Sequence, residues 1–431
     1  MIYDLPVEKS VRPSDWTVET VARLADVVGG GTPDTSNPDY WNPPEIPWVT
    51  PSDITSCVGS VLMRSERAIS VAGLHESSAT MLPKNTTLLT SRATIGECRL
   101  AGLPVATNQG FTSLVPKDGV DPQFLYCLAQ SLKAVLTRLA AGTTFIEVSR
   151  REVRRIKVCV PRSPEERALL GQIFAACDAA LACSRTRVLA AHRLKISLMQ
   201  QLFTKGIPGR HTDFQAARAL RHEFQTPRSW AVEPLGRSLV LVEYGTNAPS
   251  NDEHIGLPLV AIPEVITSRF RLGECSYAEL PESEAEALRL AKDDVLLVRT
   301  NGNSEYIGKS TVVGEEADSQ HIVFASYLIR VRTDEDILMG RYLNYFLASP
   351  LGRRLCLAMA NTSAGNHNLG ARSIRQFCFP RPFPDEQCEI VRIIDAAEDA
   401  LEAAEAECKC LERLRIGMSQ GLLTGRVRVG A

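Results

Sequence analysis

One long segment occurs twice in this 431-residue chain, and this repeat constrains the fold more than any other feature. The segment that begins PEER at residue 164 aligns without a gap with the segment that begins PDEQ at residue 384, at an offset of 220 residues. Proline followed by acidic residues is typical of a helix start, where carboxylates meet the positive end of the helix dipole. Gly206 and Gly425 are expected to end the two helices.

Both segments carry apolar residues at alternating spacings of three and four, which is the periodicity of a coiled-coil seam. The seam positions of the first segment are Leu170, Phe174, Cys177, Leu181, Ser184, Val188, Ala191, Leu198 and Leu202, and those of the second are Ile390, Ile394, Ala397, Leu401, Ala404, Cys408, Leu411, Met418 and Leu422. Either each helix covers its own domain, or the two helices bury each other. The shared seam favours an antiparallel intramolecular coiled coil about 60 Å long.

A basic residue, Lys195 or Arg415, interrupts each seam at the same place. Three interpretations stand for this pair: the side chains face DNA, they leave a gap in the seam, or they reach outward to solvent.

The residues outside the helices form two versions of one mixed unit with similar layouts. Trp16 opens the first and Trp230 the second, each followed by a glycine turn, GGGTP or YGT. Strand-like runs then align in pairs: IPWVT with LPLVA, NTTLLTSRATIG with DDVLLVRTNGNSEYIG, and VATNQGFTSLVP with HIVFASYLIRVR. A short helix and a final strand, IKVCVP or FCFP, close each unit.

The predicted fold class is therefore α+β, with two mixed α/β domains in a pseudo-two-fold repeat, separated by two long helices. The expected boundaries are a first domain at 1–162, a long helix at 163–206, a linker at 207–229, a second domain at 230–382, a second long helix at 383–425 and a tail at 426–431. Two different domains at the ends of a rigid spacer suit a DNA site made of two different half-sites. Duplex DNA repeats its groove geometry about every 34 Å, so two domains held at a fixed separation can each contact one half-site.

The formal net charge of -2 gives no global attraction to nucleic acid, so any DNA-binding surface must be local. One basic cluster, RREVRRIKVCVPR at 150–162, suits either a phosphate-facing strip or an ordinary solvated surface. The sequence lacks a signal-peptide pattern and a long uninterrupted apolar run, so we expect a cytoplasmic protein with no membrane partner.

Several motifs together resemble one known family. GGTPDTSNPDYW, IPWVTPSDI, TSRATIG and ATNQGF in the first domain, LLVRTNGNSEYIGK in the second, and the PEER and PDEQ helices are similar to those of specificity subunits of type I restriction-modification systems. The resemblance covers nearly the whole chain. It implies that residues 1–162 and 230–382 are target-recognition domains, each reading one half of a bipartite, asymmetric DNA site, while the coiled coil fixes their spacing.

The resemblance also implies partners. Double-stranded DNA, two methyltransferase subunits that modify adenine at N6, and restriction/translocase subunits are expected, with S-adenosylmethionine, ATP and Mg bound by the partner subunits and no cofactor by this chain. The residues agree with a non-catalytic role: Asn42-Pro43-Pro44-Glu45 lacks the aromatic residue of an adenine methyltransferase loop, and neither a GxxxxGK[ST] loop nor a CxxC pair occurs. The alternative function is a coiled-coil interaction scaffold without sequence-specific DNA binding.

Base readout requires hydrogen-bonding side chains on loops that can enter a groove. The candidates after strands are Ser91, Arg92, Thr94, Asn108, Gln109, Thr143 and Thr144 in the first domain, and Arg299, Asn301, Asn303, Asn366, His367 and Asn368 in the second. Each of them can instead be a turn residue that bonds nearby backbone. Gly29 to Thr32 can approach phosphate through backbone amides or form a simple tight turn.

Overall fold

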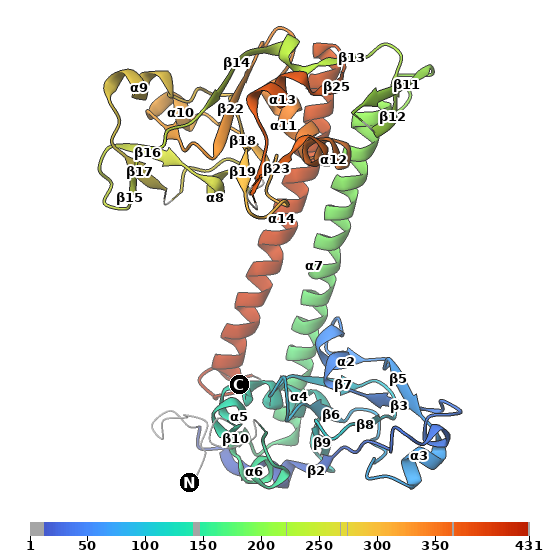
Figure 1. The fold of residues 1–431 in the computed structure, drawn as a ribbon. Helices are drawn as coiled ribbons and strands as arrows, with labels where there is room; N and C mark the ends of the chain where they lie inside the picture. Colours follow the sequence, from blue (N-terminus) through green and yellow to red (C-terminus); the bar gives the residue numbers. More distant parts are fainter. Residues whose placement is uncertain are drawn as a thin grey trace. The chain divides into compact units, whose positions relative to one another are not determined.

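The computed structural model describes residues 13–140, 147–220, 222–267, 269–273, 275–363 and 366–429. The chain forms two compact units: the first comprises Met1–Val188 with Ala404–Ala431, and the second comprises Leu189–Ala403. Each unit joins one mixed α/β body to part of the long helix α7 (Pro164–Lys205) and part of the long helix α14 (Pro384–Leu422) (Figure 1).

The body of the first unit contains a five-stranded sheet in the order β2-β9-β6-β7-β4, a three-stranded sheet in the order β5-β3-β8, and the pair β1-β10. Its strands are β1 (Trp16–Thr20), β2 (Ala25–Gly29), β3 (Ile46–Val49), β4 (Val61–Leu62), β5 (Arg67–Ile69), β6 (Thr87–Leu89), β7 (Cys98–Ala101), β8 (Ala106–Thr107), β9 (Thr112–Pro116) and β10 (Lys157–Pro161). Its helices, besides α7, are α1 (Val21–Leu24), η1 (Pro38–Tyr40), α2 (Pro51–Ser56), α3 (Val71–His75), α4 (Pro122–Ser131), α5 (Lys133–Ala140) and α6 (Arg150–Arg155).

The body of the second unit contains two four-stranded sheets, β14-β22-β18-β20 and β15-β17-β16-β21, with the small sheet β19-β24-β23 and the pair β13-β25. Its strands are β13 (Ala231–Pro234), β14 (Leu239–Tyr244), β15 (Ser250–Asn251), β16 (Leu257–Val260), β17 (Ser276–Ala278), β18 (Val295–Val298), β19 (Thr300–Asn301), β20 (Ser310–Val312), β21 (Val323–Phe324), β22 (Leu328–Thr333), β23 (Asn361–Ser363), β24 (Asn366–Asn368) and β25 (Cys378–Arg381). Its helices, besides α14, are η2 (Leu235–Ser238), α8 (Ile262–Val265), α9 (Glu282–Ala287), α10 (Glu316–Ser319), α11 (Gly340–Ala348), α12 (Pro350–Met359) and α13 (Ala371–Gln376).

The two bodies share one topology. In the first, β3 pairs antiparallel with β5 and parallel with β8. In the second, β16 pairs antiparallel with β17 and parallel with β21. The order β2-β9-β6-β7 likewise corresponds to β14-β22-β18-β20, and β1-β10 to β13-β25. The predicted pseudo-repeat of two mixed domains is therefore confirmed.

Each body contains more helices between its last sheet strand and its final strand than the sequence predicts. The predicted short helices are α4 and α11, and each is followed by two more, α5 and α6 or α12 and α13. Asp121 caps α4 by accepting a hydrogen bond from the Phe124 amide (2.8 Å), and Pro122 occupies the first turn. Leu132 alone separates α4 from α5, so the break between the two helices is short.

Each body has its own main hydrophobic core, and residues of both long helices contribute to it. In the first unit Phe174 of α7 is fully buried with Trp16 and Phe124. In the second unit Ile390 and Ile394 of α14 are buried with Trp230. Burial of one such side chain stabilises a fold by about 1.5–3 kcal/mol, so the predicted seam residues serve the domain core as well as the helix pair.

Within each unit α7 and α14 run antiparallel. In the first unit Asp178 contacts Arg415, while Arg187, further along α7, contacts Glu407, earlier on α14. In the second unit Lys195 pairs with Glu398, and Arg210, after the end of α7, pairs with Asp385 at the start of α14. The predicted antiparallel helix pair is confirmed.

The interruptions in the two seams are matched ion pairs. Lys195 and Arg415 differ by the repeat offset of 220 residues, and so do their partners Asp178 and Glu398. Arg415 Nε lies 2.7 Å from Asp178 Oδ1, and all four side chains are largely buried, with at most 20% of each exposed. Neither basic residue therefore reaches freely into solvent, and the seam is closed at these points by charge pairing.

The opening tryptophans also have equivalent partners. The Trp16 indole donates a hydrogen bond to Glu166 Oε1 (3.3 Å) in the first turn of α7. The Trp230 indole donates to Glu386 Oε2 (3.0 Å) in the first turn of α14. Glu166 and Glu386 also differ by 220 residues, so the repeat fixes how each body is attached to its helix.

The segment 207–229, expected to be a linker, contains a β-hairpin. Its strands are β11 (Phe214–Ala219) and β12 (His222–Pro227), paired antiparallel. Leu220 adopts a φ of 55° beside the turn. The two strands, FQAARA and HEFQTP, contain few of the β-branched residues that mark a strand in a sequence, so this hairpin was not predicted.

By length and composition alone, one helix among the described residues, α7, could cross a membrane. This criterion is weak evidence, because core helices of water-soluble proteins also satisfy it. The ion pairs of Asp178 and Lys195 with α14 instead favour packing against that helix.

Candidate nucleic-acid interface

Four loops meet at one end of the first body, and we call residues 29–32, 91–94, 108–110 and 147–148 the first loop cluster. Backbone hydrogen bonds hold them together. The Ser91 amide donates to the Gly110 carbonyl (2.8 Å), the Val148 amide donates to the Ser91 carbonyl (3.1 Å), and the Gly31 amide donates to the Thr107 carbonyl (2.9 Å). The structure thus brings together four segments that lie far apart in the sequence.

Glycine is required where the first of these loops crosses the third. A Cβ atom at Gly30 would lie 2.0 Å from the Asn108 carbonyl oxygen, and one at Gly31 would lie 2.3 Å from the Ser78 backbone. Close packing against neighbouring backbone therefore accounts for Gly30 and Gly31, a reason that neither interpretation of this segment included.

The candidate side chains of the first loop cluster differ in how they are engaged. Arg92 is half exposed and forms an ion pair with Glu147 (2.8 Å). Asn108 accepts a hydrogen bond from the Gly110 amide (2.9 Å), and exposed Gln109 accepts one from the Thr32 hydroxyl. Ser91 is buried, with 3% of its surface exposed, so it serves the loop junction and its side chain is not presented to a ligand.

Thr94 is partly buried and belongs to a tight turn. Its carbonyl accepts a hydrogen bond from the Thr90 hydroxyl, and Ala93 before it has a left-handed φ of 59°. The candidates Thr143 and Thr144 lie outside the described residues.

An equivalent arrangement occurs in the second body, where residues 244–246, 299–303, 325–327 and 366–369 form the second loop cluster. The Arg299 amide donates to the Tyr327 carbonyl (3.0 Å), the Leu369 amide to the Arg299 carbonyl (2.7 Å), and the Thr246 amide to the Phe324 carbonyl (2.9 Å). These bonds correspond one for one to those of the first loop cluster. Gly245 takes the place of Gly30, because a Cβ there would lie 2.1 Å from the Phe324 oxygen.

Arg299 is anchored inside the second loop cluster. Its guanidinium carbon lies 4.4 Å from the centre of the Tyr244 ring, and its Nη1 donates to the Ser326 carbonyl (3.1 Å). Among its candidate neighbours, the Asn301 side-chain oxygen accepts from the Asn303 amide (2.8 Å), and the Asn303 oxygen accepts from the Glu305 amide (2.9 Å). These bonds shape the loop and leave exposed Asn303 at its surface.

The remaining candidates lie on the small sheet β19-β24-β23. Asn301 is opposite His367, and Thr300 is opposite Asn368. Asn366 pairs through its backbone with Ser363 at the other end of β24. The structure therefore gathers all six candidates of the second domain into one loop cluster.

Sequence reasoning missed other members of the two clusters. Glu147 in the first was not singled out, nor were Ser326 and Tyr327 in the second, although Tyr327 is 38% exposed. The alignment of VATNQGF with HIVFASYL could have identified Ser326. Gln109 and Ser326 occupy the same place after the equivalent strands β8 and β21.

The basic cluster at 150–162 is partly used inside the first body. The Arg154 guanidinium donates to the Val27 carbonyl (3.1 Å), and the Arg150 side chain covers Gly29 of the first loop cluster. Arg150 and Arg154 thus hold α6 against β2, and exposed Arg150 adds positive charge beside the loops.

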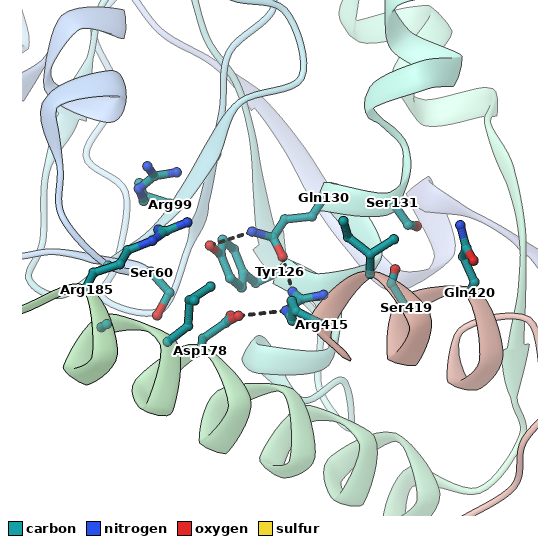
Figure 2. Close-up of a pocket in the computed structure, with 14 residues that line it drawn as sticks. Ser60, Arg99, Tyr126, Gln130, Ser131, Asp178, Arg185, Arg415, Ser419 and Gln420 are labelled. Atoms are coloured by element: carbon teal, nitrogen blue, oxygen red, sulfur yellow. Dashed lines mark hydrogen bonds and ion pairs between the residues drawn. The ribbon is translucent and has the colours of Figure 1, made fainter. Parts of the chain in front are cut away.

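The first unit also contains an open pocket of about 470 Å³ beside α7 and α14 (Figure 2). Its wall carries a polar chain in which Gln130 of α4 donates to the Tyr126 hydroxyl (2.8 Å) and accepts from Arg415, which pairs with Asp178. The Arg415 guanidinium also lies 4.6 Å from the Phe174 ring centre. This network fastens the body of the first unit to both long helices.

Two titratable groups at or beside this pocket have raised pKa values. Burial raises the pKa of the Tyr126 hydroxyl and raises the pKa of the neighbouring Cys98 thiol to about 12. Neither group therefore ionises near neutral pH, as a nucleophile or base would require. Throughout the described residues, no group of three or more His, Cys, Asp or Glu side chains could hold a metal ion.

Comparison with known proteins identifies this architecture. Residues 13–186 match the family described as "Type I restriction modification DNA specificity domain". The chain is 31% identical over 259 residues to the type I restriction enzyme MjaIX specificity subunit of Methanocaldococcus jannaschii, covering 59% of each chain. It is 26% identical over 151 residues to the EcoKI specificity subunit of Escherichia coli, covering 35% of this chain and 32% of that one. The chain thus matches less than two thirds of the length of either relative.

Two solved structures share the fold over nearly the whole chain. The type I restriction-modification S subunit of M. genitalium superposes with a TM-score of 0.59 at 14% identity, covering 98% of this chain and 99% of that one. A chain from a study of complex assembly and conformational transition of the type I system gives a TM-score of 0.56 at 18% identity, covering 96% and 99%. The fold is that of a two-domain specificity subunit. Residues 13–186 of this chain carry the domain of that family, the type I restriction modification DNA specificity domain.

Proposed function

We propose that this chain is the DNA-recognition subunit of a type I restriction-modification complex. It reads a bipartite, asymmetric DNA site and directs adenine-N6 methylation and restriction by partner subunits. The observation that carries this proposal is the pair of loop clusters, which are built by the same backbone hydrogen bonds but carry different side chains. Equivalent frames with unlike surfaces suit two half-sites of different sequence.

The residues that contact DNA are proposed to be the exposed and half-exposed side chains of the clusters. In the first these are Arg92 and Gln109. In the second they are Asn303, with Asn368 and His367 on the adjoining strand. Arginine favours guanine, and asparagine or glutamine favours adenine. Ser91 and Arg299 act by holding the loops in place.

The roles of the segments of this chain and of its partner subunits follow from the proposed function. Residues 1–162 and 230–382 are the two target-recognition domains, with 163–206 and 383–425 as spacer helices joined by 207–229 and followed by the tail 426–431. Two methyltransferase subunits and restriction/translocase subunits supply the chemistry, together with S-adenosylmethionine, ATP and Mg. This chain binds double-stranded DNA, carries no cofactor and acts in the cytoplasm without a membrane partner.

The test is to co-express the chain with its cognate methyltransferase subunit and to map methylated adenines in host DNA by long-read sequencing. We expect a new motif of two unlike half-sites separated by a fixed unread gap. Binding of the complex to this site should weaken steeply as salt is added, because phosphate contacts release counterions.

The coiled-coil scaffold predicts a different result. A complex that forms, contains an active methyltransferase and yet methylates no bipartite motif would refute the recognition role. Affinity for DNA at background level, with little dependence on salt, would then support the scaffold.

A further inference from the structure

An arginine lies on a tryptophan platform at the edge of the first body. The Arg67 guanidinium carbon is 4.1 Å from the centre of the Trp41 ring and 5.0 Å from that of Trp48. Arg67 is the first residue of β5, opposite Trp48 on β3, and is exposed to solvent. A cation over an indole face is attracted by the ring quadrupole, and tryptophan gives the strongest interaction of this kind.

The platform itself is fixed by its neighbours. The Trp41 ring meets the buried Trp48 ring edge to face at 5.2 Å, and its indole N–H donates to the Asp34 carbonyl (3.1 Å). The Trp48 indole donates to the Gly31 carbonyl (3.0 Å), which belongs to the first loop cluster. Arg67 is therefore held beside the loops proposed to read DNA.

The positive charge of Arg67 is not neutralised by a carboxylate among the described residues of the first body. Among the residues that the structure describes, Arg67 forms no ion pair, whereas Arg92 in the adjacent loop pairs with Glu147. Stacking occupies the face of the guanidinium and leaves its in-plane N–H groups available. These donors form a fixed fork that matches two neighbouring acceptors.

The second body has no such cation at the matching position. Trp48 corresponds to Leu259 and Arg67 to Ser276, because each pair is opposed in the same way on equivalent strands. The Ser276 hydroxyl donates to Asp252 Oδ1 (2.9 Å), so an acidic group stands near the place of the basic one. This difference suits a role in only one half-site.

We propose that Arg67 contacts the DNA of the first half-site, donating two hydrogen bonds to a pair of adjacent acceptors. These acceptors are either O6 and N7 of a guanine or two phosphate oxygens, which the same fork can bind. Trp41 is a positioning residue that holds the guanidinium flat. This inference rests on the proposed DNA-recognition function.

The test uses the complex of the full chain with its methyltransferase subunits, comparing Arg67→Ala and Arg67→Lys with the wild type. Arg64→Ala is the matched control, since Arg64 is an exposed arginine three residues away for which the structure shows no aromatic stacking. Affinity for the mapped site, its salt dependence and the methylated motif are measured for each. Melting curves confirm that the variants fold.

We expect Arg67→Ala to weaken binding about 5- to 150-fold and Arg64→Ala to leave it unchanged. A guanine contact relaxes one position of the first half of the motif, and Arg67→Lys fails to restore it. A phosphate contact leaves the motif intact and reduces the slope of log affinity against log salt by about 0.9, which Arg67→Lys largely restores.

Trp41→Leu and Trp41→Phe test the platform. Trp41→Leu should reproduce part of the Arg67→Ala loss, and Trp41→Phe should recover most of it because the ring face is kept. If Arg67→Ala changes neither affinity, salt slope nor motif while the wild type reads a bipartite site, the inference about Arg67 is wrong and the proposed function stands. If the wild type reads no such site, the proposed function itself fails.

Discussion

Glu386 attaches the second body to the start of α14. Its carboxylate is 3% exposed, accepts the Trp230 indole N–H and lies 2.7 Å from His211 Nε2. A buried carboxylate with several donors stabilises a fold mainly because its removal leaves those donors unsatisfied.

We therefore expect Glu386→Ala to lower the free energy of unfolding by about 3 kcal/mol. Glu389→Ala is the control, because Glu389 is 38% exposed and, among the residues that the structure describes, forms an ion pair with Arg210 alone, so its loss should cost less than about 1 kcal/mol. Urea denaturation of both variants checks the difference. Equal effects would mean that the buried contacts of Glu386 add nothing.

Glu233 joins β13 to β25 and makes stability depend on pH. The hydrogen bond from Arg381 (2.6 Å) lowers the pKa of Glu233 below its ordinary value of 4.5. A carboxylate with a depressed pKa in the folded state contributes stability above its unfolded pKa and loses it as pH falls through the folded pKa.

The stability advantage of the wild type over Glu233→Gln should thus be present at neutral pH and shrink on acidification below pH 4.5. Urea midpoints measured across this range for both proteins check it. An advantage that is constant or grows in acid would contradict the assigned role of the Arg381 hydrogen bond.

At the scale of elements, the long helices were the most predictable part of the chain. Their proline and acidic starts at 164 and 384 coincide with the observed first residues, and Gly206 and Gly425 have the left-handed φ values of 72° and 74° that end a helix. The partners of Lys195 and Arg415 could not be read from the sequence. They lie on the other helix, so only the pairing register identifies them.

The ion pair between α7 and α14 in the first unit supplies a test of that register. Arg415→Ala leaves Asp178, which is 13% exposed, without its partner and should cost about 3 kcal/mol in unfolding free energy. Arg413→Ala, two residues away on an exposed position of the same helix, should change it by less than about 0.5 kcal/mol. A double-mutant cycle with Asp178→Ala should show strong coupling for Arg415 and none for Arg413.

At the scale of the whole molecule, the sequence predicted which loops lie together better than it predicted the contacts of individual side chains. The repeated order of glycine turn, strands and short helix was sufficient to align the two bodies. It could not show that Arg299 lies on Tyr244 or that Ser91 is buried, because those roles depend on contacts between distant segments. The Trp41 and Arg67 platform was missed for the same reason.

The central claim is that each loop cluster recognises one half-site independently of the other. Its most direct test compares the methylated motif of the wild-type complex with those of the Gln109→Ala and Asn303→Ala complexes. These residues are exposed members of the first and second loop clusters. We predict that Gln109→Ala alters positions in one half of the motif only and that Asn303→Ala alters positions in the other half only. If both variants alter the same half, or either alters both halves, the assignment of one half-site to each loop cluster is contradicted.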